Sequence, residues 1–128
     1  MPDTEKITIN MSAVDLGKVD LLVQEGLYGN RTDFIRTAIR NQLEKHNFEI
    51  QQSVKRNDYA IGVLIYSRQD LEKFKAQGKK LKVRMIGLLS LATDIPPDLG
   101  REVIESLKVL GILIASEELK AALADRIK

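Results

Sequence analysis

The 128-residue sequence contains no cysteine and only one histidine, His46. The lack of cysteine excludes a disulfide framework and any thiolate metal site, and it fits a reducing cytoplasm. No apolar run approaches the roughly 20 residues of a membrane span. The start, Met1-Pro2-Asp3, lacks the basic and apolar segments of a signal peptide. We therefore expect a cytoplasmic protein with no membrane partner.

An excess of positive charge is also missing, because the net charge at pH 7 is only +2. Residues 1–58 carry eight Lys or Arg against nine Asp or Glu, whereas residues 59–128 carry twelve against nine. Bulk charge therefore gives the first half no attraction to nucleic acid, and any DNA binding must depend on where individual side chains point. The hydrophobic content of 44% is enough for a packed core at this length.

Motifs of catalysis are absent as well: the sequence has no phosphate-binding loop, no nucleophile elbow and no cluster of metal ligands. Carboxylate pairs such as Glu117-Glu118, or Asp98 with Glu102, lie at expected helix starts, where the helix dipole accounts for them. We therefore expect no enzyme, no catalytic residue, no metal and no cofactor.

What the sequence does contain begins with a strict alternation over residues 6–11, which predicts one short, half-buried strand. One face carries Lys6, Thr8 and Asn10, and the other carries Ile7, Ile9 and Met11. Helix signals follow at once, so the chain offers no hairpin partner, and a lone strand cannot satisfy its own backbone. The partner strand must come from a second copy about a twofold axis.

Two helices are predicted after this strand. Ser12, with Asp15 three residues later, is typical of a helix start, and Gly26 of a helix end. A turn at residues 27–29 leads to a second start at Asn30-Arg31-Thr32-Asp33. The apolar positions expected to be buried are Leu16, Val19, Leu22 and Val23 in the first helix and Ile35, Ala38, Ile39 and Leu43 in the second.

This order of strand, helix and helix resembles the ribbon-helix-helix family of repressors related to Arc, MetJ and CopG. The resemblance covers about residues 5–46, and its motifs are Lys6-Ile-Thr-Ile-Asn and Gly26-Leu-Tyr-Gly-Asn-Arg-Thr-Asp-Phe-Ile-Arg-Thr-Ala-Ile-Arg. It is closest to the amino-terminal domain of nickel-responsive regulators. Nickel coordination by several imidazoles is excluded here, because His46 is the only histidine and is expected to be an exposed helix residue.

The resemblance implies a homodimer that binds double-stranded DNA with an intermolecular antiparallel ribbon in the major groove. It places base contacts at Lys6, Thr8 and Asn10, where alternate side chains on a ribbon reach base edges. The alternative is an ordinary solvated strand face.

The resemblance also implies a phosphate site at the start of the second helix, formed by Asn30, Arg31 and Thr32. Free amides and the positive end of the helix dipole favour a phosphate there. The alternative is a plain helix cap built by Asn30 and Asp33, and the two can coexist. A solvent or salt-bridge surface is the favoured interpretation of the face that holds Arg36 and Arg40.

Residues 59–128 contain an imperfect repeat. Three apolar segments recur 25 and then 24 residues apart: Ile61-Gly-Val-Leu-Ile, Ile86-Gly-Leu-Leu-Ser-Leu and Leu110-Gly-Ile-Leu-Ile. Each is followed by a polar break and a helical stretch, at residues 67–77, 96–107 and 116–127. This pattern predicts a small parallel sheet covered on one face by helices. The alternative is a ferredoxin-like or ACT-like sandwich in which residues 80–91 form a long antiparallel strand.

The expected fold class is therefore α+β, with three segments. Residues 1–46 form the ribbon-helix-helix DNA-binding domain, residues 47–58 a helix extension or linker, and residues 59–128 a small α/β domain of strand-helix repeats for oligomerisation or sensing. The expected function is a sequence-specific transcriptional regulator, a repressor, that acts as a homodimer or as a tetramer or larger assembly.

Two alternatives stay open: an antitoxin that neutralises a partner toxin and autorepresses its operon, and a DNA-partition assembly protein. Antitoxins of this family usually carry a carboxy-terminal segment that folds only on its partner. Residues 59–128 are rich enough in Val, Ile and Leu to fold alone, which favours the regulator. An unknown effector or partner protein of this domain also stays open.

Overall fold

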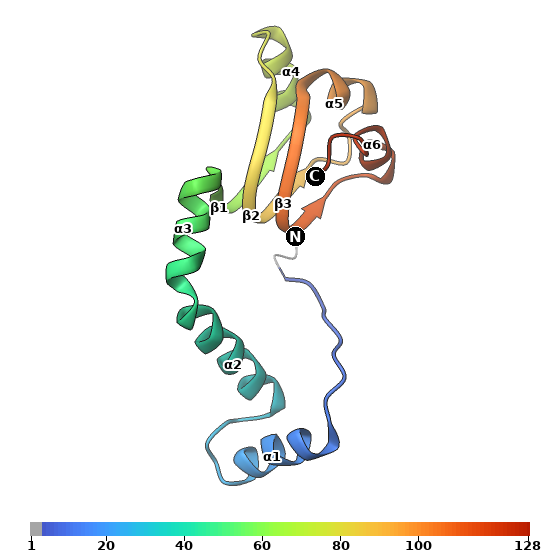
Figure 1. Cartoon of the computed structure of the whole chain (residues 1–128). Helices are drawn as coiled ribbons and strands as arrows, with labels where there is room; N and C mark the ends of the chain where they lie inside the picture. The colour runs from blue at the N-terminus through green and yellow to red at the C-terminus, as the bar shows by residue number, and fades with distance from the viewer. Residues whose placement is uncertain (1–3) are drawn as a thin grey trace. The chain divides into compact units, whose positions relative to one another are not determined.

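A computed structural model describes residues 4–128 of the chain (Figure 1). The main body of the chain divides into two compact units, Lys6–Arg56 and Asn57–Lys128. Within the described residues, no helix combines the length and the apolar character needed to cross a membrane.

The amino-terminal unit is built from three helices, α1 (Ala13–Gln24), α2 (Arg31–Lys45) and α3 (Asn47–Asn57). The predicted starts of the first two helices are confirmed, because the side chains of Ser12 and Asn30 cap α1 and α2. The predicted end of α1 is confirmed too, since Gly26 follows the helix with a φ of 83°, which glycine adopts at little cost. Most of residues 47–58 forms α3.

Residues 6–11 form neither a helix nor a strand within the single described chain. Their side chains are exposed, and Ile7 keeps 78% of its surface accessible. A strand is defined by its hydrogen-bonded neighbour, and the chain supplies none for this segment. The antiparallel ribbon therefore stays a prediction about two chains.

The carboxy-terminal unit alternates strands and helices in the predicted order (Figure 1). Its elements are β1 (Ala60–Tyr66), α4 (Arg68–Ala76), β2 (Leu81–Leu91), α5 (Pro97–Val103), β3 (Ile104–Ile114) and α6 (Glu117–Ala122). The sheet order is β1-β2-β3, and both strand pairs are parallel. The parallel repeat is confirmed, and the antiparallel sandwich is wrong: β2 is long, but it runs in the same direction as its neighbours.

The repeat is visible in the register of the sheet. Gly62 pairs with Gly87, and Gly87 pairs with Gly111, so the three glycines form one row across the strands. Leu71 and Leu119, which hold matching places in α4 and α6, are fully buried.

The boundaries of the third repeat differ from the prediction. The expected helix at residues 96–107 ends at Val103, and β3 starts at Ile104 rather than near Leu110. Pairing with β2 explains this difference, because Leu81 is already in register with Ile104. An irregularity between Leu81 and Lys82 absorbs one residue of mismatch, as a bulge does. The last helix, expected at residues 116–127, is only α6.

A single apolar core lies between the sheet and the three helices α4, α5 and α6. Alternate residues of β2 point into it, as expected for a strand with one covered face. Its buried members are Leu71, Leu81, Val83, Met85, Leu89, Leu91, Ile95, Leu99, Val103, Ile104, Leu107, Leu119 and Leu123. Burial of a large aliphatic side chain contributes about 1.5–3 kcal/mol before conformational entropy is counted, so this unit has a substantial core of its own.

Candidate nucleic-acid interface

The turn between α1 and α2 fixes where the second helix begins. The amide of Leu27 donates to the carbonyl of Leu22 at 3.0 Å and closes the end of α1. Tyr28 in the turn packs edge-on against Phe34 in the first turn of α2, with ring centroids 5.0 Å apart. Aromatic pairs prefer this edge-to-face geometry. The start of α2 is therefore held by packing as well as by its cap.

Two side-chain hydrogen bonds cap α2. The amide of Asp33 donates to the side-chain oxygen of Asn30 at 2.8 Å, and the amide of Gly29 donates to the Asp33 carboxylate at 2.9 Å. The amide of Phe34 makes the first helical bond, to the carbonyl of Asn30 at 3.2 Å. Asn30 and Asp33 thus form the predicted cap, and the amides of Arg31 and Thr32 lie ahead of the helical ladder, where a helix start binds anions.

The side chain of Arg31 has a partner that sequence reasoning missed. Its Nε and Nη2 donate to the two carboxylate oxygens of Asp20 in α1, each at 2.8 Å. The hydrogen bond from Arg31 lowers the pKa of Asp20 below its ordinary value of 3.8, and the same bond raises the pKa of Arg31. The pair spans eleven residues and two helices, so no local pattern marks it.

This pair bears on the expected phosphate contact. Two of the five N–H groups of the guanidinium point at Asp20, and both side chains are about half exposed. A phosphate at the start of α2 would meet the backbone amides directly, but it would share the Arg31 side chain with a carboxylate. The side-chain contribution of Arg31 to DNA binding is therefore expected to be modest.

The other expected contacts, Lys6, Thr8 and Asn10, lie exposed in the segment before α1. The structure places Asn30, Arg31 and Thr32 together at the start of α2. It does not assemble the ribbon face, because that face requires a second strand.

The amino-terminal unit leaves much of its apolar surface uncovered in a single chain. Of the described side chains in α1, only Val19 is fully buried, and α2 has none. One chain does not form the expected buried face of α2, since Ala38, Ile39 and Leu43 are exposed. Its burial stays a prediction about two chains. Large apolar side chains exposed in this unit are Ile7, Ile9, Met11, Val14, Leu21, Leu27, Ile39, Leu43 and Phe48. Exposed apolar side chains that gather into a patch mark interaction sites on soluble proteins.

His46 lies at the end of α2, with its Nε2 atom 3.3 Å from Nε2 of Gln42 and its Nδ1 atom 3.9 Å from Glu49. It is about half exposed, as expected. Within residues 4–128, no three or more His, Cys, Asp or Glu side chains gather as a metal site would require.

Comparison with known proteins supports the resemblance. The sequence profile of the ribbon-helix-helix transcriptional regulator family matches residues 2–120. The match runs from the segment before α1 through the parallel sheet, so it covers residues 6–56 completely and the carboxy-terminal unit as far as residue 120. No curated protein and no solved structure gives a significant match.

Proposed function

This chain belongs to the ribbon-helix-helix transcriptional regulator family, and from that premise we propose that it is a sequence-specific DNA-binding repressor that acts as a homodimer or a higher oligomer. Residues 1–46 are the DNA-binding domain, and residues 59–128 form an oligomerisation or sensory domain. Residues 47–58 are the helix extension or linker that connects the two domains. Residues 6–11 of two subunits pair as an antiparallel ribbon that enters the major groove.

The observation that carries the proposal is the uncovered apolar surface of the amino-terminal unit. Ile7, Ile9 and Met11 alternate with polar residues and remain exposed in the single chain. A twofold partner would turn these side chains inward over Ile39 and Leu43 and close one shared core. The same pairing leaves the opposite ribbon face to the solvent or to DNA.

In the proposed complex, two kinds of contact have separate roles. Lys6, Thr8 and Asn10 read base edges, because alternate side chains of a ribbon reach donors and acceptors in the major groove. Asn30, Arg31 and Thr32 position the dimer by holding a phosphate at the start of α2.

The buried core of residues 57–128 favours a regulator over an antitoxin. An antitoxin segment that folds on its toxin lacks enough apolar residues for a core of its own. Here thirteen buried apolar residues pack between a sheet and three helices. No observation favours a DNA-partition role over transcriptional regulation.

The test is a comparison of ribbon variants on an operator selected from random DNA with the full-length protein. Asn10→Ala and Thr8→Ala should each cost about 1–3 kcal/mol on that operator and leave binding to random DNA nearly unchanged. Gln69→Ala, an exposed polar change in α4, is the matched control. Binding should be measured on purified, folded dimers at one salt concentration. If both ribbon variants bind the operator as the unchanged protein does, the ribbon does not read bases and the proposal fails.

A further inference from the structure

Strand β1 is an unprotected edge of the parallel sheet. Within the described sheet it pairs only with β2. Its sequence, Ala-Ile-Gly-Val-Leu-Ile-Tyr, contains no charge and no proline. Ile61, Val63 and Ile65 lie on the face of β1 opposite the helices, since Leu64 and Tyr66 face the core, and they keep 58%, 55% and 64% of their surfaces exposed. Sheet edges in soluble proteins normally carry lysine, proline or a covering segment, because their free N–H and C=O groups accept further strands.

The opposite edge is different, because the end of the described chain covers the beginning of β3. The amide of Leu107 donates to the carbonyl of Arg126 at 3.0 Å, and the amide of Lys128 donates to the carbonyl of Leu107 at 2.7 Å. The guanidinium of Arg126 also donates to the carbonyl of Ile104 at 2.7 Å. Repeat arrays need caps at their ends. In this array the β3 end is partly capped and the β1 end is open.

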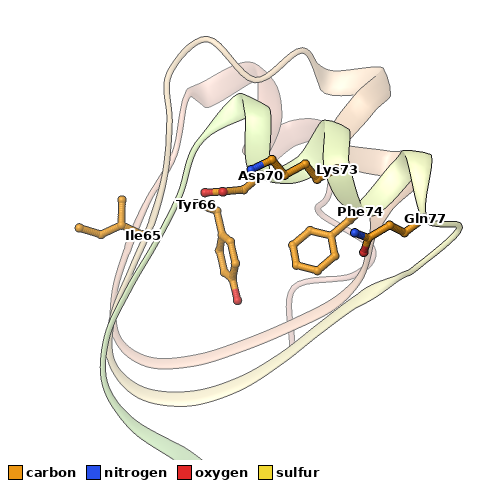
Figure 2. A pocket seen from close by; sticks show the side chains of 6 residues that line it. All are labelled: Ile65, Tyr66, Asp70, Lys73, Phe74 and Gln77. Carbon is orange, nitrogen blue, oxygen red and sulfur yellow. The ribbon is translucent and has the colours of Figure 1, made fainter.

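A groove continues this open end beside β1. It has a volume of about 380 Å³ and is lined by Ile65, Tyr66, Asp70, Lys73, Phe74 and Gln77. Figure 2 shows Tyr66 and Phe74 side by side beneath α4, whereas Ile65 points away from them. The two rings meet edge to face, with centroids 6.1 Å apart, and they pack against the core without being buried in it. The partly buried rings of Tyr66 and Phe74 are therefore accessible at this edge.

The row of glycines indicates that a backbone fits at the same edge. Gly87 and Gly111 have φ values of 135° and 127°, and a Cβ on either would collide with the carbonyl oxygen of the preceding glycine in the row. Gly62 has a similar φ of 146°, but a Cβ there would meet no described atom within 4 Å. The space that a neighbouring carbonyl fills beside β2 and β3 is thus open beside β1.

We propose that β1 pairs with β1 of a second copy of this chain, antiparallel about a twofold axis, so that two three-stranded sheets join into one. Identical edges related by a twofold axis run antiparallel, and one such pairing satisfies both edges and stops. Growth by pairing β3 of one copy with β1 of the next is disfavoured, because the chain already covers the start of β3.

The size of the edge selects a second copy over an unrelated protein. Seven residues of strand span only about 23 Å, and a single strand pair of that length buries well under the roughly 800 Å² per partner of a stable free complex. A second, separate contact must therefore hold the partner strand close to β1. This step rests on the homodimer of the proposed function, in which only Asp58 and Tyr59 separate α3 from β1 in each chain. A dimer thus carries a second β1 at high local concentration.

Cysteine cross-linking of the full-length protein tests the pairing, because the natural sequence has no cysteine. Ile61→Cys, Val63→Cys and Ile65→Cys each place one thiol on β1, and Leu110→Cys places a comparably exposed thiol on β3, where the native side chain is 49% exposed. Under mild oxidation, at least one β1 variant should form a disulfide between copies at least about tenfold faster than Leu110→Cys, because pairing raises the effective thiol concentration. Val63→Lys is then added to whichever of Ile61→Cys and Ile65→Cys cross-links faster. This second change should lower the rate of disulfide formation towards that of Leu110→Cys.

Three results would overturn the proposal: equal rates for the β1 and β3 thiols, cross-links that form only in mixtures of Ile61→Cys and Leu110→Cys, or β1 thiols that are protected from maleimide yet do not cross-link. Circular dichroism establishes that each variant is folded. Operator binding is measured on the same samples, so a failure of DNA recognition is distinguishable from a failure of β1 pairing.

Discussion

The Arg31 side chain at the start of α2 holds both carboxylate oxygens of Asp20 in α1, at 2.8 Å each. This bidentate pair joins the two helices at the point where the family resemblance expects a phosphate. Planar carboxylate and phosphate groups compete for the same guanidinium geometry. Asp20 therefore orients Arg31, and it should weaken the attraction of this side chain for a phosphate.

The pKa of Asp20 should depend on Arg31. Carboxyl titration by NMR is expected to place it below 3.8 in the unchanged protein and to return it towards that value in Arg31→Ala. A carboxyl whose pKa falls on folding adds stability above its unfolded pKa, and this stability is lost as the pH drops through the folded pKa. The unchanged protein should therefore lose this contribution on acidification below pH 4, whereas Arg31→Ala should lack it. An unshifted Asp20 would show that the pair does not persist in solution.

Phosphate contact at the start of α2 predicts opposite effects for the two partners on DNA. Arg31→Ala should weaken binding to the operator and to random DNA alike, and should lower the salt slope by about one unit per subunit. Asp20→Asn removes the competing charge and should strengthen both kinds of binding. Fluorescence anisotropy over a salt series measures both. A loss confined to the operator would instead assign Arg31 to base recognition.

The amino-terminal unit should be stable only as a dimer, because its apolar surface is uncovered in one chain. Ile9→Asp places a charge in the proposed shared core and should abolish cooperative folding of this unit. Thr8→Asp, one residue earlier on the outward face, should leave dimerisation intact and serves as the control. Sedimentation equilibrium and thermal unfolding provide the measurements. A folded monomer of residues 1–50 at micromolar concentration would refute the shared core.

The glycine row should be intolerant of side chains. Gly87→Ala meets two costs, about 1–3 kcal/mol of backbone strain and about 1–3 kcal/mol of overpacking against the carbonyl of Gly62. Gly78→Ala, in the turn before β2, has a φ of 67° and no atom near its added methyl, so it meets only the strain. Urea unfolding should show the larger destabilisation for Gly87→Ala. Equal losses would mean that the strands separate readily to accommodate a methyl group.

Local features of this protein follow from the sequence alone, because their causes lie within a few residues. The hydroxyls of Ser12 and Ser116 accept amide hydrogen bonds three residues later, as helix-start signals predict. The apolar segments 25 and 24 residues apart predict three equivalent strand-helix units, and the parallel register confirms them. The family resemblance likewise rests on short motifs that need no long-range information.

Contacts between distant segments were decided only by the tertiary structure. The early start of β3 at Ile104 depends on hydrogen bonds with β2. The sequence around Ile104 contains no pattern that predicts a strand start there. Asp20 meets Arg31 because the turn between α1 and α2 brings the two helices together, so neither residue identifies the other in the sequence. The proposed ribbon is decided neither by the sequence of one chain nor by its tertiary structure, since the hydrogen bonds that would make residues 6–11 a strand would have to come from a second chain.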